Sequence, residues 1–142
     1  MNNIRNARLE DINQLVSLLT QLGYPNSIDF YEKQLENMLA REDFQILVYE
    51  LEGKVVALVS IHFYAQLIFE GEIANLGIFI VDKDVRGKGI GRVMEEYVTQ
   101  LAKERRCALI EVFSKERRKD AHRFYNRQGY IERHKFFEKE LK

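Results

Sequence analysis

Helical periodicity is clear in three parts of the chain. Apolar residues recur every three or four positions over residues 12–22, after an acidic start, and predict a first helix. The same spacing over residues 31–39 predicts a second helix, with Ser27 or Asp29 as its N-cap. The longest stripe runs over residues 90–103, with charged and amide side chains on its opposite side.

The period changes to that of strands between and after these helices. Short, mostly apolar runs predict five strands, at residues 4–7, 44–51, 54–64, 72–81 and 108–113. Glu52 and Gly53 form the turn of a hairpin. A short helix ending at Gly129 and two edge-type segments over residues 130–141 complete the chain. This order predicts an α/β (α+β) fold with a mixed, mostly antiparallel central sheet flanked by helices, and with parallel neighbours in its second half.

Composition narrows the class of protein. The 142 residues fit a single domain over residues 1–142, and 22 Lys and Arg balance 22 Asp and Glu. That balance argues against nucleic-acid partners, although a basic run covers residues 115–123. With one cysteine, Cys107, no disulfide framework is available. The sequence has no charged-then-apolar leader and no apolar run near the length of about 18 residues that spans a membrane, so we expect a cytoplasmic protein without a membrane partner.

The chemistry of the chain is concentrated between the fourth strand and the longest helix. Gly87, Gly89 and Gly91 alternate there with cationic side chains. Glycine allows positive φ angles and close approach of a ligand to the backbone. Because the first amides of a helix are unpaired and its dipole favours negative charge, the loop is expected to bind a phosphate.

Spacing excludes two familiar phosphate loops. A P-loop needs GxxxxGK[ST], and no Gly-Lys pair in this chain is followed by Ser or Thr. A dinucleotide loop needs GxGxxG, whereas residues 87–91 read GxGxG, and its acidic ribose residue about twenty positions later would fall in a basic stretch.

The pattern that fits is RxxGxG over residues 86–91, between a strand and a helix. It resembles the acyl-CoA pyrophosphate loop of the GNAT family of N-acetyltransferases. A second element agrees: the strand at 108–113 is followed by DAHRFYNRQGY, residues 120–130, which is similar to the family's Ala-x-x-Phe/Leu-Tyr-x-x-x-Gly-Phe/Tyr segment. The resemblance covers residue 72 to the C-terminus most closely.

The resemblance implies acetyl-CoA as the acyl donor, bound where two parallel strands, 72–81 and 108–113, splay apart. The pantetheine arm would pair with the backbone of Phe79, Ile80 and Val81. The pyrophosphate would meet the loop, formed by Arg86, Gly87, Lys88, Gly89, Ile90, Gly91 and Arg92. Arg118 stands where many relatives have a cofactor-binding asparagine, so it is a further candidate for contact with a CoA phosphate.

The resemblance also implies direct attack of an amine on the thioester, without an acyl-enzyme. Tyr125 stands where the family has the tyrosine that protonates the leaving thiolate. Cys107 has no visible activating base and is expected to be a core residue.

A base must remove a proton from the attacking ammonium, and two carboxylates are candidates. Glu72 is the first choice, because it lies near a position where relatives carry a glutamate. Glu111, a carboxylate within an otherwise apolar strand, is the second candidate. The three histidines, at 62, 122 and 134, are scattered singly, so no metal site is expected.

The sequence thus predicts an acetyl-CoA-dependent N-acetyltransferase acting on a primary amine of a small molecule or a protein. The alternative from another class is a non-catalytic acyl-CoA-binding sensor or interaction module. Residues 63–70 are rich in aromatic and long apolar side chains. They are ordinary strand or core, line the acceptor cleft, or pair two copies into a homodimer, and the sequence leaves these alternatives open. Nucleic-acid binding through residues 115–123 is disfavoured because aromatic residues are not interleaved there.

Overall fold

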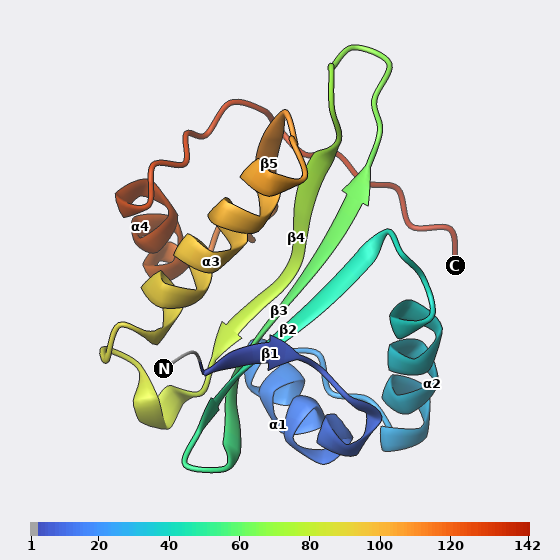
Figure 1. The fold of residues 1–142 in the computed structure, drawn as a ribbon, viewed down its shortest axis with the longest axis vertical. Helices are drawn as coiled ribbons and strands as arrows, with labels where there is room; N and C mark the ends of the chain where they lie inside the picture. Colours follow the sequence, from blue (N-terminus) through green and yellow to red (C-terminus); the bar gives the residue numbers. More distant parts are fainter. Residues whose placement is uncertain (1–2) are drawn as a thin grey trace. The chain divides into compact units, whose positions relative to one another are not determined.

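The computed structural model describes residues 3–142 (Figure 1). The chain divides into two compact units, a first one that ends at Glu111 and a second over Val112–Lys142, and each is described by itself. In the described residues no helix is both long enough and apolar enough to cross a membrane.

The first unit is built on a five-stranded sheet. Its strands lie in sequence order, β1 to β5, and all neighbours are antiparallel except β4 and β5, which run parallel. The strands are β1 (Ile4–Asn6), β2 (Phe44–Leu51), β3 (Lys54–Tyr64), β4 (Ile73–Val81) and β5 (Leu109–Val112). Three α-helices belong to this unit: α1 (Ile12–Leu22), α2 (Ile28–Leu39) and α3 (Ile90–Glu104). Short 3-10 turns, η1 (Leu9–Asp11) and η2 (Lys83–Val85), precede α1 and follow β4. The mixed α/β fold predicted from the sequence is confirmed.

Local signals in the sequence explain several boundaries. Glu52 and Gly53 both have positive φ, 53° and 77°, which closes the tight turn between β2 and β3. Ser27 caps α2, because its side chain accepts from the Phe30 amide at 3.1 Å. Of the two predicted N-caps, Ser27 is therefore the one used.

A β-bulge interrupts the pairing of β3 with β4. Ser60 pairs with Ile78 and Ile61 with Leu76, which leaves Gly77 as the extra residue. A Cβ on Gly77 would lie 3.1 Å from the Ser60 Oγ, so a side chain at this position would press on the neighbouring strand. Because of the extra residue, the alternation of β4 side chains between the two faces of the sheet is offset by one position across the bulge.

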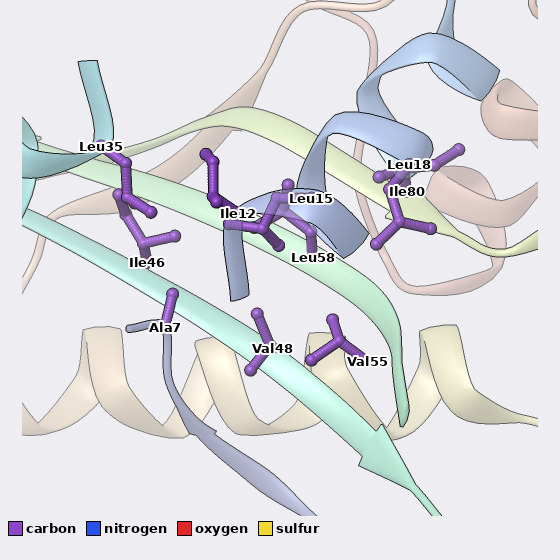
Figure 2. Close-up of a cluster of buried hydrophobic side chains, with 10 residues drawn as sticks. All are labelled: Ala7, Ile12, Leu15, Leu18, Leu35, Ile46, Val48, Val55, Leu58 and Ile80. Carbon is purple, nitrogen blue, oxygen red and sulfur yellow. The ribbon is translucent and has the colours of Figure 1, made fainter. Parts of the chain in front are cut away.

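Helices α1 and α2 cover one face of the sheet. The core beneath them joins aliphatic residues of both helices to alternate residues of the strands (Figure 2), namely Ala7, Ile12, Leu15, Leu18, Leu35, Ile46, Val48, Val55, Leu58 and Ile80. Alternation along a strand sends the intervening residues to the other face, where Val59, Ile61 and Phe63 are fully buried. Helix α3 contacts β3 and β4 and buries Met94 and Val98.

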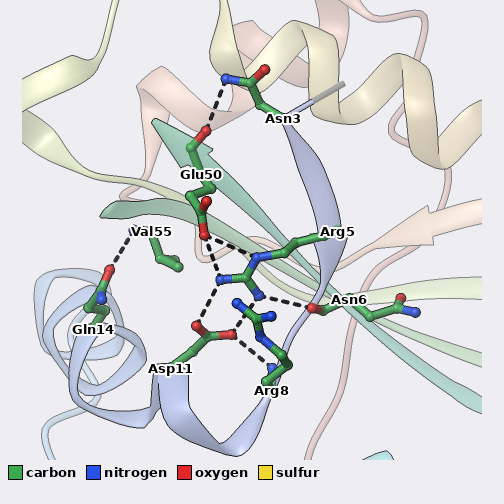
Figure 3. A network of polar contacts seen from close by, with 8 residues as sticks. All are labelled: Asn3, Arg5, Asn6, Arg8, Asp11, Gln14, Glu50 and Val55. Carbon is green, nitrogen blue, oxygen red and sulfur yellow. Dashed lines mark hydrogen bonds and ion pairs between the residues drawn. The ribbon is translucent and has the colours of Figure 1, made fainter. Parts of the chain in front are cut away.

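An ionic network ties the N-terminal strand to the start of α1 (Figure 3). The Arg5 guanidinium donates to both oxygens of Asp11 at 2.9 Å and to Glu50 at 2.8 Å. Asp11 is buried and also accepts from the Arg8 amide at 2.8 Å. The Arg5 hydrogen bond holds the pKa of the Asp11 carboxyl below its usual value, and the same contact raises the pKa of Arg5.

Replacing Arg5 with Met should lower the free energy of unfolding by about 2 kcal/mol at pH 7. This value lies between the cost of breaking an exposed ion pair and that of breaking a buried one. The buried Asp11 would keep its charge and lose its partner. A carboxyl with a depressed folded pKa stabilises the fold above its unfolded pKa of about 3.9, and this contribution disappears as pH falls through the folded pKa. Urea titrations measure the free energy of unfolding at pH 7 and at low pH. The difference between wild type and Arg5→Met should therefore be smaller in acid.

Arg92→Met provides the control for this stability measurement. Arg92 forms an exposed i,i+4 pair with Glu96 at 3.2 Å, and its loss should cost no more than about 0.5 kcal/mol. The role given to the buried pair would be contradicted if both variants lost the same free energy of unfolding. It would also be contradicted if the difference between wild type and Arg5→Met did not change with pH.

The second unit contains one helix, α4 (Lys119–Arg127), and Gly129 follows it with φ 93°. Tyr125 is buried and lies edge-on to Phe124 and Tyr130, with ring centroids 5.5 and 5.4 Å away. The two edge segments predicted over residues 130–141 are wrong, because no strand is formed there. Phe136 and Phe137 break strict alternation, and residues 131–142 are exposed, so this stretch has no apolar face with the period of a strand.

Candidate active site

The glycine loop leads directly into α3. Gly87 and Gly89 have φ of 82° and 81°, and Gly89 is the N-cap of the helix. The first helical bond runs from the Val93 amide to the Gly89 carbonyl at 3.1 Å, so the amides of residues 90–92 precede the helical ladder. No side chain of the described residues caps this end, and a Cβ at Gly87 or Gly89 would meet nothing within 4 Å. The loop thus presents bare amides to open space.

Neighbouring elements fix the start of the loop. Asp82 is buried, and its side chain accepts from the Asp84 amide at 2.9 Å. The Gln21 side chain, from α1, accepts from the Lys83 amide at 3.0 Å. The Asp82 amide donates to Val56 O at 2.7 Å. These bonds anchor the entry of the loop to β3 and α1.

Two of the predicted phosphate-binding cations have protein partners. The Arg86 Nε donates to Val81 O at 3.0 Å, and Arg92 pairs with Glu96 within α3. Lys88 is exposed. Arg86 thus contributes to the shape of the loop as well as its charge.

The outer edge of β4 is left partly open by the shortness of β5. The strands meet near their starts, where the Ala108 amide donates to Glu72 O at 2.7 Å. Since β5 ends at Val112 and runs parallel, its end lies about level with Leu76. Residues 78–81 extend beyond it. Phe79 and Ile80 have buried side chains. The register directs the backbone groups of Ile80 to Leu58 on β3 and those of Phe79 and Val81 to this edge.

A carboxylate lies on β5 beside this edge. Oε2 of Glu111 accepts from the Tyr64 hydroxyl at 2.5 Å and from the Asn75 amide at 2.9 Å. The three residues come from β5, β3 and β4, and Asn75 precedes the bulge at Gly77 by two positions. Within the described residues the second oxygen, Oε1, has no hydrogen-bond partner. Glu111 therefore has one oxygen fixed in place and one available.

Burial and the contact with Glu111 raise the pKa of Tyr64 to about 12. The phenol therefore remains protonated across the physiological range and keeps donating to the carboxylate. The sequence singles out Glu111 by itself, but includes Tyr64 only as one of residues 63–70 that could line the acceptor cleft, without a role of its own.

Glu72, the other predicted base, immediately precedes β4, at the end of the strand opposite to the glycine loop. Its carboxylate pairs with Arg105 at 3.1 Å. The Arg105 guanidinium is also stacked over the Phe63 ring, 3.8 Å from its centroid. Glu72 thus has a structural partner of its own, and its catalytic role stays a prediction.

Cys107 is half-buried, and burial raises the pKa of its thiol. A thiol with a raised pKa is a poor nucleophile at neutral pH. In the second unit, burial likewise raises the pKa of Tyr125, so its phenol holds a proton that it could donate. Arg118 is the N-cap of α4, and its carbonyl accepts from the His122 amide at 3.1 Å.

Comparison with known proteins identifies the family. The family model described as the acetyltransferase (GNAT) family matches residues 9–130. The chain belongs to the GNAT acetyltransferase family. Its members are acetyl-CoA-dependent acetyltransferases, and the GNAT chain described here is such an enzyme.

Solved structures agree in fold, and a curated relative is named as an N-acetyltransferase. An aminoalkylphosphonate N-acetyltransferase of Salmonella typhimurium is 29% identical over 141 residues, which are 97% of this chain and 90% of the relative. Among solved structures, a transcriptional regulator from Bacillus halodurans has a TM-score of 0.90 at 22% identity, with 97% and 98% of the two chains covered. Glucosamine-6-phosphate N-acetyltransferase from Arabidopsis thaliana has a TM-score of 0.85 at 22% identity, with 98% and 97% covered. At these identities the structures support the fold alone.

Features of the loop suit a diphosphate. The amides of residues 90–92 lie at the positive end of α3, and the absence of side chains at Gly87 and Gly89 leaves room in front of them. Acetyl-CoA carries a diphosphate and an extended arm with amide groups, so it matches both the loop and the open edge of β4.

Proposed function

We propose that this GNAT enzyme transfers an acetyl group from acetyl-CoA directly to a primary amine of a small molecule or a protein, and that residues 1–142 act as one domain. The observation that supports it best is Glu111, whose one oxygen is held by Tyr64 and Asn75 while the other is available. The family match across both units, residues 9–130, supports a single functional domain.

Acetyl-CoA supplies the acetyl group as an activated thioester. The backbone of Phe79, Ile80 and Val81 would pair with the amides of its pantetheine arm, as an added strand does. The diphosphate would be bound by the loop amides and surrounding charge, from Arg86, Gly87, Lys88, Gly89, Ile90, Gly91 and Arg92. Arg118 is proposed to contact a CoA phosphate, since an arginine suits such a group.

Glu111 is proposed as the general base. An ammonium has no lone pair, so the acceptor must lose a proton before it attacks, and Oε1 of Glu111 would accept that proton directly or through a water. Tyr64 and Asn75 hold Oε2 and so orient the carboxylate. Glu72 is kept as the competing base, although its carboxylate is already paired with Arg105.

Tyr125 is proposed as the acid. As the bond between carbon and sulfur breaks, its phenol would donate a proton to the departing sulfur, so that free CoA leaves as a thiol. No acetylated side chain is required. The raised pKa of Cys107 supports this direct route.

Tyr125→Phe should lower kcat by about ten- to a hundredfold, because general acid catalysis contributes factors of this order or more. The dissociation constant of acetyl-CoA should stay within about twofold, since the ring is retained. The measurement is CoA release, followed with a thiol-detecting dye, for both proteins with a panel of primary amines.

Tyr130→Phe is the matched control, since Tyr130 is the ring that packs on Tyr125. It should leave kcat near wild type. An equal loss of kcat in both variants would indicate an effect on packing. An unchanged kcat in Tyr125→Phe would show that Tyr125 is not the acid. If wild type released no CoA with any amine, the proposed acetyl transfer to amines would be contradicted.

A further inference from the structure

A row of stacked side chains crosses the sheet face next to Glu111. The Arg41 guanidinium lies 5.0 Å from the centroid of the Phe44 ring. Phe44 and His62 are stacked with centroids 4.4 Å apart, and His62 and Tyr64 with centroids 5.6 Å apart. Tyr64 then donates to Glu111. We call these five residues the acceptor row.

The row lies on the face that α1 and α2 cover elsewhere. Phe44 pairs with His62, and His62 pairs with Asn75 on β4, so their side chains project from the same side of the sheet. His62 and Arg41 remain partly or largely exposed, with side-chain exposed fractions of 35% and 59%. Solvent, and hence a ligand, can reach this part of the face.

The two ends of the row differ in the hydrogen-bonding groups that they leave available. Asp43 is fully engaged, because it accepts from Arg41 at 3.0 and 2.7 Å and lies 3.1 Å from the His62 Nε2. In the described part of the chain the Nη1 of Arg41 has no partner, so this end offers donors. The Glu111 end offers the acceptor Oε1.

We propose that the row binds an acceptor with two charges: an ammonium at Glu111 and an anionic group, a carboxylate or a phosphonate, at Arg41. This inference rests on the proposed transfer to an amine and names the class of acceptor. The planar donors of Arg41 suit such anions, and Asp43 binds the guanidinium through Nε and Nη2, which leaves Nη1 without a partner among the described residues.

The sheet also sets the length of the acceptor. Arg41 lies over a β2 residue and Glu111 belongs to β5, three strand spacings away, which is about 14 Å at about 4.8 Å per spacing. Side chains reach inward, so the amine and the anion should be on the order of 10 Å apart. This separation favours an extended acceptor, a long amino acid or a peptide, over a compact one.

The test compares acceptors that differ at one end. The amine is the same in 8-aminooctanoate and octylamine, and only the first carries an anion; 3-aminopropylphosphonate is short, and spermidine is cationic throughout. The wild-type enzyme should have its lowest KM for 8-aminooctanoate. Arg41→Gln should raise that KM about ten- to a hundredfold, the usual contribution of a charge-assisted hydrogen bond, and leave the KM for octylamine within about twofold.

Lys33→Gln, which removes one exposed positive charge from α2, is the control and should change neither KM. Arg41→Lys should recover part of the loss. The inference is overturned if Arg41→Gln affects the two long acceptors alike, or if spermidine or 3-aminopropylphosphonate has a lower KM than 8-aminooctanoate. CoA release by wild type with octylamine in these same assays would leave the proposed acetyl transfer intact, whereas release with none of the four and with no amine of the wider panel would contradict the transfer itself.

Discussion

Glu111→Gln should lower kcat/KM by about a hundred- to ten-thousandfold, the largest effect expected from any single side chain of this enzyme. Gln has nearly the same shape and can still accept from Tyr64 and Asn75, but its amide cannot take a proton from the acceptor. Acetyl-CoA affinity should change little. The measurement is CoA release at saturating acetyl-CoA, with calorimetry of acetyl-CoA binding alongside.

The pH profile gives an independent check on the same residue. If Glu111 takes the proton, the Glu111→Gln variant depends on acceptor that is already deprotonated, so its loss of kcat/KM relative to wild type should shrink as pH rises toward the pKa of the acceptor amine. Glu36→Gln, at an exposed position of α2, serves as the control. A greater loss in Glu72→Gln than in Glu111→Gln would transfer the role of base to Glu72.

Gly89→Val should weaken acetyl-CoA binding by about ten- to a hundredfold. Gly89 has φ 81°, where a β-branched residue is strained by about 1 to 3 kcal/mol, and the loop would relax away from the geometry that presents its amides. The added side chain would also enter the space in front of α3 that the diphosphate is proposed to fill. Calorimetric titration with acetyl-CoA measures the change in dissociation constant.

Gly53→Val is the matched control for this variant. Gly53 has a similar φ of 77° and equally open surroundings, but it lies in the β2–β3 turn. Both variants should lose comparable stability in thermal unfolding, and only Gly89→Val should lose affinity. Equal affinity losses, or none at Gly89, would contradict the assignment of the diphosphate to the loop.

Most of the fold follows from local patterns in the sequence. The helical stripes at residues 12–22 and 90–103 and the turn at Glu52 and Gly53 were predicted because each depends on residues close in the chain. The tail was mispredicted because residues 130–141 contain apolar side chains without a strand period. The bulge at Gly77 was not foreseen, since it depends on the registers on either side of it.

The candidate site was only partly predictable for a similar reason. The glycine loop is one short motif, and its position before a helix could be read directly. The contacts of Glu111 join residues 47 and 36 positions apart, and those of His62 with Asp43 depend on the pairing of β2 with β3. Without the register of the strands, Tyr64 and Arg41 were indistinguishable from ordinary strand-end and loop residues.

A crystal structure of the enzyme with CoA and an amine acceptor would test the central claim most directly. The account predicts an acceptor nitrogen about 2.6 to 3.2 Å from Oε1 of Glu111, or joined to it by a single water, with the pantetheine arm along residues 79–81. An acceptor nitrogen beside Glu72, or one with no carboxylate within reach, would contradict it.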